Sequence, residues 1–487
     1  MAVALTAILS GCTATAGHPA GAAGSAVSGP SGSSVTTAGA PTTSDQPAPD
    51  PAAATTTDAW TTYQADPQRL GVAPTQPPLA PLHLAWSAPL DGTAVYGQPL
   101  YASGLVLVAT EGDDVYALDP RHGTVVWKDT IGVPLRHTAS YAGCGDIDPL
   151  GVTSTPVVDR GAGVLYAVGE VSQGGVPPVS HVLVAIDVAS GRILERVGVD
   201  PPLPPGESTI HLLQRAALAL GNGRVYVGYG GQAGDCGRYH GWLVSVPVVG
   251  GPSGGSETAF DVTPDSTGGA IWEGGSGPAI STDGGVYVTT GNPNSGGPSP
   301  WAEAVVELPP LLGATPEAVF QDRAASGDLD LATGGPELLP DGTVFAAGKT
   351  EIGYRLRQSD LSPLGPVGGR VCASDPDGGA AYDGGLASLF LPCNRGGLQQ
   401  IDLAAGRVGW RAGSVNSTPV LVDGALWALS YPAGHIEELD PATGRTLYRS
   451  QVGRKVPTFA SLSAADGLLL VPTLTGAAAF AGPQGPG

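Results

Sequence analysis

The stretch VYALDPRHGTVVW, residues 115–127, contains the turn that decides the fold of this chain. A short apolar strand ends at Asp119, Gly123 follows four residues later, and Trp127 four residues after that. An aspartate side chain can accept hydrogen bonds from the backbone of a tight turn, and glycine takes positive φ angles without steric cost. The pattern therefore predicts a β-hairpin whose returning strand carries a large side chain.

The same turn recurs along the chain. The further copies are LVAIDVASGRILE at 183–195, LQQIDLAAGRVGW at 398–410 and IEELDPATGRTLY at 436–448. Asp402 and Asp440 of the last two copies lie 38 residues apart, which is about the length of one four-stranded propeller blade. Strand–turn–strand segments rich in β-branched and aromatic residues, such as STPVLVDGALWALS, precede the turns. The period indicates a repeat architecture.

Counted together, these segments predict an all-β, eight-bladed β-propeller. The last blade, FASLSAADGLLLVPTLTGAAAF at 459–480, lacks a fourth strand. HLAWSAPL, residues 83–90, is an N-terminal strand without a partner of its own, and it can complete that blade. Closure of this kind leaves no exposed strand edge where the chain ends meet. A stack of unrelated β-sandwiches is the alternative, and it would not give so regular a period.

Two segments precede the predicted propeller, which we place at residues 59–487. Residues 1–12, MAVALTAILSGC, resemble a bacterial lipoprotein signal that would lead to lipidation of Cys12, although no Lys or Arg precedes the apolar run. Residues 13–58 contain no aromatic residue and consist almost entirely of Ala, Gly, Ser, Thr and Pro. Such a stretch cannot bury enough apolar surface to offset its ordering entropy, so we expect a disordered tether. The two segments predict an extracytoplasmic protein, anchored by lipid to the cell membrane or secreted.

The cysteine count agrees with export. Once Cys12 is set aside for lipid, Cys144, Cys236, Cys372 and Cys393 remain, and three pairings are possible. We favour Cys372–Cys393, which are close in sequence, and Cys144–Cys236, which lie in consecutive repeat units. Four buried thiols in a cytoplasmic protein are the alternative, but an oxidising compartment favours disulfides.

Composition excludes several kinds of partner. Charged residues make up 13% of the chain, and the formal net charge is -21. Nucleic acid and anionic lipid headgroups both require clustered Lys and Arg, so we expect no nucleic acid and no membrane contact beyond the lipid anchor. The eight His show no zinc-site spacing, and no glycine-rich phosphate loop is present. We expect a monomer that holds a protein or a small molecule in the central funnel.

The Asp-x-x-x-Gly-x-x-x-Trp turn resembles the repeat of the pyrroloquinoline-quinone (PQQ) propellers, the quinoprotein dehydrogenase-like superfamily. The resemblance spans about residues 59–485. It implies one of two branches: the calcium- and quinone-dependent alcohol dehydrogenases, or non-enzymatic relatives such as the outer-membrane-protein assembly lipoproteins. The turn indicates the superfamily without choosing the branch.

The resemblance implies a set of site residues for the dehydrogenase branch. Trp272 in GAIWEGGSGP matches the tryptophan under the quinone, and Lys349 in VFAAGKTEIGY matches a basic residue at the quinone oxygens. Asn292, after the strand VYVTTG, matches a calcium ligand, and Asp330 in GDLDLATGGP matches the catalytic base at the calcium ion. Glu170 in LYAVGEVSQGG would complete the calcium site. In such a site calcium polarises the quinone carbonyl while the aspartate removes the alcohol proton.

Two features of the dehydrogenases have no counterpart in this sequence. The paired cysteines beside the quinone are replaced by the single Cys144, and there is no Cys-x-x-Cys-His motif for a covalent haem. Asn292 and Lys349 also have plain structural uses, as a loop-capping amide and as a cation at the funnel rim. The sequence therefore favours a ligand- or protein-binding or assembly module. A PQQ- and calcium-dependent alcohol or sugar dehydrogenase is the alternative.

Overall fold

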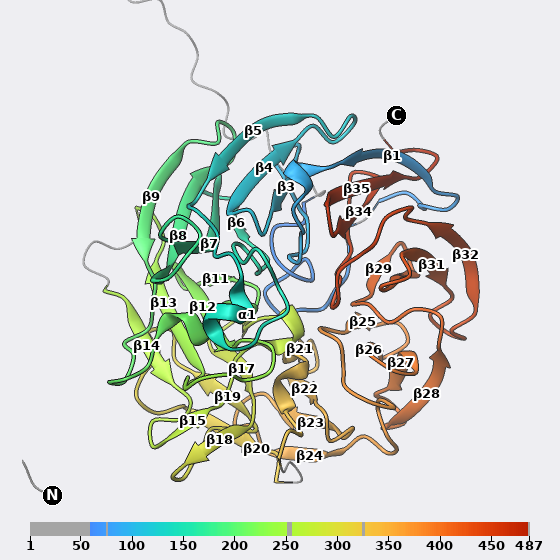
Figure 1. The fold of residues 1–487 in the computed structure, drawn as a ribbon. Helices are drawn as coiled ribbons and strands as arrows, with labels where there is room; N and C mark the ends of the chain where they lie inside the picture. Colours follow the sequence, from blue (N-terminus) through green and yellow to red (C-terminus); the bar gives the residue numbers. More distant parts are fainter. Residues whose placement is uncertain (1–58, 75, 251–255, 324–326, 486–487) are drawn as a thin grey trace, which may run out of the picture. The chain divides into compact units, whose positions relative to one another are not determined.

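The computed structural model describes residues 59–74, 76–250, 256–323 and 327–485. Within these ranges the strands form eight blades arranged in a ring, seven of four strands and one of five, all antiparallel (Figure 1). The predicted eight-bladed β-propeller is confirmed. The predicted signal with Cys12 and the predicted tether at 13–58 lie outside the described residues.

Each blade begins with its innermost strand. Blade 1 contains β2 (Leu100–Ala102), β3 (Leu105–Ala109), β4 (Asp114–Leu118) and β5 (Val125–Thr130), and blade 2 contains β6 (Val157–Asp159), β7 (Val164–Ser172), β8 (Val179–Asp187) and β9 (Ile193–Gly198). Blade 3 contains β10 (Leu212–Leu213), β11 (Ala219–Gly221), β12 (Arg224–Gly231), β13 (Trp242–Pro247) and β14 (Thr258–Asp261), and blade 4 contains β16 (Ala279–Ile280), β17 (Val286–Thr290), β19 (Ala304–Leu308) and β20 (Ala318–Gln321).

The second half of the ring follows the same order. Blade 5 contains β21 (Glu337–Leu339), β22 (Thr343–Ala347), β23 (Gly353–Arg357) and β24 (Pro363–Pro366), and blade 6 contains β25 (Ala381–Asp383), β26 (Ser388–Cys393), β27 (Gly397–Asp402) and β28 (Arg407–Ala412). Blade 7 contains β29 (Val420–Val422), β30 (Ala425–Ser430), β31 (His435–Leu439) and β32 (Thr446–Gln451), and blade 8 contains β33 (Ser463–Ala465), β34 (Leu468–Thr473), β35 (Gly476–Ala481) and β1 (His83–Ala88).

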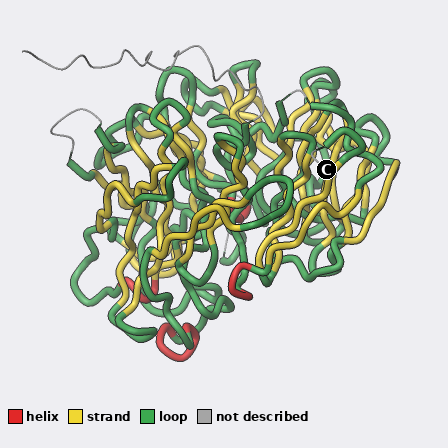
Figure 2. Tube along the Cα trace, turned by 90° about the horizontal axis from the view of Figure 1, so that it is seen from above, coloured by secondary structure: helices red, strands yellow, loops and turns green. Residues whose placement is uncertain are grey.

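Outside the blades there is little regular structure in the described ranges. β15 (Ser266–Gly268) and β18 (Pro293–Gly296) form a separate two-stranded antiparallel sheet, from segments that precede β16 and follow β17 of blade 4. The helical segments are short: α1 (Thr138–Ala142), η1 (Leu90–Gly92), η2 (Thr209–His211), η3 (Glu273–Gly275) and η4 (Leu331–Thr333). Figure 2 shows these red segments among loops that connect the yellow strands. None of the described helices has the length and apolarity required to cross a bilayer.

The ring closes as the sequence predicts. β1 pairs antiparallel with β35, with His83 opposite Ala481 and Ala88 opposite Ala477, so the first strand completes the last blade (Figure 1). Trp86 of β1 then packs on the turn of blade 1, where its indole Nε1 donates to the carbonyl of Pro120 at 2.8 Å. The strand pairing joins the early and late parts of the described chain, and the indole contact joins blade 8 to blade 1.

Adjacent blades are held together by the predicted turns. Asp119 Oδ1 accepts hydrogen bonds from the backbone N–H groups of Arg121 and His122, at 3.0 and 2.9 Å, as the capping role requires. A tryptophan of the preceding blade lies against the glycine of such a turn in three pairs, Trp86 with Gly123, Trp127 with Gly191 and Trp410 with Gly444. These glycines have φ angles of 65°, 76° and 68°. The absent side chain therefore matters twice, for the backbone angle and for the packing of the indole.

A pair of glycine substitutions separates those two roles. At Gly406, with φ of 62°, an added Cβ meets no heavy atom within 4 Å, so Gly406→Ala is expected to cost only the left-handed backbone strain of about 1–2 kcal/mol. At Gly191 an added Cβ would lie 2.7 Å from Trp127 Cγ, so Gly191→Ala should add roughly 1–3 kcal/mol for the displaced indole. Urea unfolding of both variants measures the difference. Equal losses of stability would show that the tryptophan contact contributes nothing.

The centre of the ring is filled by residues 60–73, the central segment, whose role the sequence did not predict. Its backbone hydrogen-bonds to the innermost strands β2, β6, β16, β21, β25 and β29. Blades 3 and 8 contact it through side chains: Arg69 Nη2 donates to the carbonyl of Leu218 at 3.2 Å, and Ser461 Oγ donates to the Tyr63 hydroxyl at 3.3 Å. Trp60, Tyr63 and Arg69 are fully or almost fully buried. The central segment thus contacts all eight blades.

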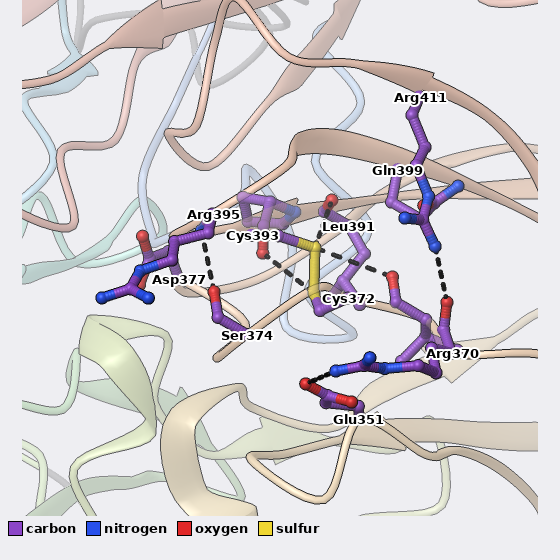
Figure 3. The surroundings of a disulfide bond; sticks show 12 residues. Glu351, Arg370, Cys372, Ser374, Asp377, Leu391, Cys393, Arg395, Gln399 and Arg411 are labelled. Carbon is purple, nitrogen blue, oxygen red and sulfur yellow. Dashed lines mark hydrogen bonds and ion pairs between the residues drawn. A yellow bond between two sulfur atoms is a disulfide. The ribbon is translucent and has the colours of Figure 1, made fainter.

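The two favoured cysteine pairs are both formed. Cys144 and Cys236 have Cα atoms 5.7 Å apart, and those of Cys372 and Cys393 are 5.6 Å apart. The second bridge fastens the loop after β24 to the end of β26 in blade 6 (Figure 3). Beside it, Ser374 Oγ accepts from the Arg395 backbone N–H at 2.8 Å. Both favoured pairings are thus confirmed.

Candidate functional site

A cavity of about 310 Å³ lies where the loops of several blades meet. Two kinds of loop form its walls. Loops that lead into innermost strands contribute Arg215, Trp272, Asp330 and Phe459, and loops between the second and third blade strands contribute Asp235, Asn292 and Lys349. Because these loops repeat around the ring, residues far apart in sequence lie side by side. The volume is within the range of small-molecule sites.

Trp272, Asn292, Asp330 and Lys349, four of the five residues expected from the dehydrogenase resemblance, line this cavity. Glu170 does not. It lies in β7, 3% exposed, with its Oε2 3.7 Å from His181 Nε2. The predicted calcium-binding role of Glu170 therefore finds no support in the lining of the cavity.

Asp330 is at the centre of the polar contacts in the cavity. Trp272 Nε1 donates to its Oδ2 at 2.7 Å, the Ala332 backbone N–H donates to its Oδ1 at 2.9 Å, and Lys349 Nζ lies 3.9 Å from Oδ2. Burial raises the pKa of Asp330 to about 6, against the opposing effects of Lys349 and the indole N–H. Asp330 is thus a carboxylate at neutral pH that is already hydrogen-bonded on both oxygens.

Lys349 and Trp272 are held in place by other neighbours. Lys349 Nζ also pairs with Asp328 at 2.6 Å; although burial opposes its charge, the two aspartates raise the pKa of Lys349 above its ordinary value. The indole of Trp272 meets the ring of Phe459 edge-on, with centroids 5.5 Å apart. One wall of the cavity is therefore aromatic and pre-organised.

The donor set does not fit a calcium ion. Calcium takes six to eight oxygen ligands, several of them carboxylates. Here Asp330 faces the ammonium group of Lys349, Asn292 Nδ2 donates to Asn294 Oδ1 at 3.2 Å, and Glu170 lies outside the cavity lining. Nor does any group of three or more His, Cys, Asp or Glu within the described ranges have the arrangement of a metal site.

Arg215, a second cation of the cavity, is not among the site residues predicted from the sequence. It is 6% exposed, and its guanidinium lies over the ring of Tyr96, 5.8 Å from the centroid. The sequence does contain an indication of this residue. Arg215 is the only charged residue of LLQRAALAL, a run that leads into a blade and is otherwise typical of a buried core segment. A single charge in such a run indicates a buried polar contact or a site.

The rim of the cavity is tied by a disulfide. Cys144 and Cys236 are bonded, and their near neighbours Asp146 and Asp235 both line the cavity. The hydroxyl of Tyr239, a third rim residue, donates to Asp235 Oδ1 at 2.5 Å. The loop between β12 and β13 is thereby fixed to the loop that follows α1.

The family model described as the outer membrane protein assembly factor BamB matches residues 53–259. The match and the eight-bladed ring agree. The chain is similar to the PQQ-like β-propellers in the sequence of these residues and in its fold. A search of curated proteins finds no match to this PQQ-like propeller.

Similar solved structures come from both branches of the superfamily. A europium-containing methanol dehydrogenase has 13% sequence identity and a TM-score of 0.65, with 88% of this chain and 98% of that chain covered. The quinohemoprotein alcohol dehydrogenase from Comamonas testosteroni has 15% identity and a TM-score of 0.65, covering 89% and 82%. BamB from Moraxella catarrhalis has 13% identity and a TM-score of 0.55, covering 82% and 99%. At these identities the likeness establishes the fold of the PQQ-like propeller, and its activity has to be argued from the site.

Proposed function

We propose that this PQQ-like propeller is a non-catalytic binding module that acts outside the cytoplasm and holds a small molecule in the cavity around Trp272. The observation that carries the proposal is the cavity itself, in which an aromatic wall faces a few convergent polar groups. That combination is typical of ligand sites. A protein partner could use the same scaffold, as the likeness to BamB suggests.

The proposed location rests on two kinds of observation. The disulfides Cys144–Cys236 and Cys372–Cys393 suit an oxidising compartment. Residues 1–12 resemble a lipoprotein signal, which would place the propeller on a lipid anchor at Cys12. A secreted form without the anchor would meet the same conditions.

A PQQ- and calcium-dependent alcohol or sugar dehydrogenase is the second candidate. One observation favours it: Trp272 and Asn292 of blade 4 and Asp330 and Lys349 of blade 5 line one cavity. The lack of a calcium donor set weighs against it, because Asp330 is already engaged by Lys349 and Trp272. We therefore derive no reaction step through calcium.

A titration of the full chain with PQQ, with and without calcium, separates the two candidates. We expect calcium to change the apparent Kd by less than about twofold, because no group of three or more acidic, His or Cys side chains in the described ranges is arranged to hold a metal ion. Isothermal calorimetry measures the affinity directly, and Asn292→Ala serves as the matched variant. Saturable binding that requires calcium and is abolished by Asn292→Ala and by Asp330→Ala would support the dehydrogenase hypothesis. It would contradict the proposal of a non-catalytic module.

A further inference from the structure

The guanidinium of Arg215 lines the cavity and lies over the ring of Tyr96, but it has no hydrogen-bond or ion-pair partner among the described residues. Arg215 is 6% exposed, yet among the described residues none of its N–H groups has a hydrogen-bond acceptor and no carboxylate lies within ion-pair distance. Its Nη2 is completely buried and unpaired. A buried charged donor without an acceptor lowers stability, so native proteins seldom retain one without a use for it.

Two other buried or partly buried cations of this fold do have hydrogen-bond or ion-pair partners. Arg69, which is fully buried, donates to the carbonyls of Pro278 and Tyr63 at 2.8 and 2.9 Å. Lys349, the other cation among the described residues of the cavity lining, pairs with Asp328 at 2.6 Å. Arg215 alone of the three has no such partner within the described ranges.

The surroundings of Arg215 keep its charge unneutralised. Burial raises the pKa of Glu111, the nearby buried carboxyl, to about 8, so this group is mostly protonated at neutral pH. Asp146 is exposed to solvent at the rim. Gly275, with φ of 89°, lies so close that an added Cβ would collide with Nη1 of Arg215. The backbone there leaves room for the guanidinium but offers it no acceptor.

We propose that Arg215 anchors the carboxylate of a small aromatic ligand whose ring lies against Trp272 and Phe459. A guanidinium binds a carboxylate through paired, charge-assisted hydrogen bonds, and those are the bonds that Arg215 lacks. The apolar part of the cavity, which includes Trp272, Phe459 and Leu213, accepts the body of the ligand. The inference rests on the proposed binding function and names the ligand class for it.

The acidic rim limits the charge of the ligand. Asp146, Asp235 and Asp328 are exposed around the cavity, and the whole chain carries a formal net charge of -21. This negative field opposes the entry of a multiply charged anion such as a phosphate monoester. Because Arg215 is the one cation of the described lining without a hydrogen-bond or ion-pair partner, the site suits a monocarboxylate.

The test uses a panel of aromatic monocarboxylates, each paired with its neutral carboxamide, among them 2-naphthoate and 2-naphthamide. Binding to the full chain is measured by calorimetry. We expect at least one carboxylate to bind about tenfold or more tightly than its amide, the advantage that a charge-assisted pair supplies. In Arg215→Met this ratio should fall to about one, with the amide unaffected. Arg121→Met, which removes an exposed arginine of blade 1, should leave the ratio unchanged.

The stability of Arg215→Met gives an independent readout. Because Arg215 has no acceptor among the residues that the structure describes, its replacement by an apolar side chain of similar length should leave Tm unchanged or raise it. If the role of Arg215 were only structural, its replacement would lower Tm. A lower Tm, or a carboxylate advantage that survives in Arg215→Met, overturns the inference.

The outcomes also separate this inference from the proposed function. If carboxylates and amides bind wild type equally well, the cavity is a ligand site but Arg215 is not its anion anchor. If no member of the panel binds at millimolar concentration, the proposal of an aromatic carboxylate and that of a small-molecule module both fail. The propeller would then be studied as a protein-binding scaffold.

Discussion

Arg69→Met is expected to destabilise the propeller by roughly 3–5 kcal/mol, the usual loss when one member of a buried, fully hydrogen-bonded charged group is removed. The guanidinium of Arg69 donates five hydrogen bonds, to the carbonyls of Pro278, Leu218 and Tyr63 and to the hydroxyl of Thr62. Methionine fills much of the volume but leaves these acceptors buried and unpaired. Urea unfolding followed by fluorescence measures the loss.

Arg215→Met is the matched control, since it makes the same replacement at a second buried arginine, one that has no hydrogen-bond acceptor in the part of the chain that the structure describes. Arg69→Lys should lie between Arg69→Met and wild type, because a single ammonium cannot reach all four partners. If Arg69→Met unfolds at the wild-type urea concentration, the central segment does not hold the blades together.

Stability is expected to fall steeply as the pH rises from about 5 to 9. Burial raises the pKa of Glu111 and Glu273 to about 8 and that of Asp113 to about 9. Burial also raises the pKa of Glu337 well above its ordinary value. Each of these folded-state pKa values exceeds the unfolded one, so the folded protein holds protons that the unfolded chain releases. The stabilisation is complete below the unfolded pKa values near 4 and is lost as the pH passes through 8 to 9.

Thermal unfolding at half-unit pH intervals checks this expectation, and Glu273→Gln tests its cause. Glutamine is neutral at every pH and can still accept from the Thr289 backbone N–H, which donates to Glu273 Oε1 at 2.8 Å. The variant should therefore lose less stability between pH 7 and 9 than wild type does. Glu195→Gln, at an exposed position of β9, should follow the wild-type curve. A Tm that is flat or rises from pH 5 to 9 would contradict the assignment of buried, protonated carboxyls.

The parts of the fold that could be predicted all depend on short stretches of sequence. The turn at Asp119 and Gly123 carries its own capping group and its own positive φ angle, so its geometry is local. Its repetition implied blades, and the unpartnered strand at 83–90 implied closure onto the last blade. The Cys372–Cys393 pair followed from closeness in sequence. In each case the determining contact is local or repeats with the blade.

The candidate site was predictable only in part. The superfamily resemblance supplied Trp272, Asn292, Asp330 and Lys349, and the ring brings them to one cavity because corresponding loops of successive blades meet at the same place. Glu170 occupies a loop-proximal position in blade 2, but its side chain is buried near His181 instead. Strand position sets which loop a residue is near, whereas the direction and pairing of its side chain depend on the neighbouring blade.

The sequence by itself determined the blade turns, because hydrogen bonds between near neighbours specify them. It also indicated the number of blades and the closing strand, because the strand pattern repeats and leaves one strand without a partner. Only the tertiary structure decided that residues 60–73 fill the centre, since that segment has no regular pattern and finds its partners on six innermost strands more than 20 residues away. Only the tertiary structure decided, too, that the guanidinium of Arg69 has hydrogen-bond acceptors, whereas that of Arg215 has none among the described residues. Both are single arginines in the sequence, and the acceptors that distinguish them come from residues distant along the chain.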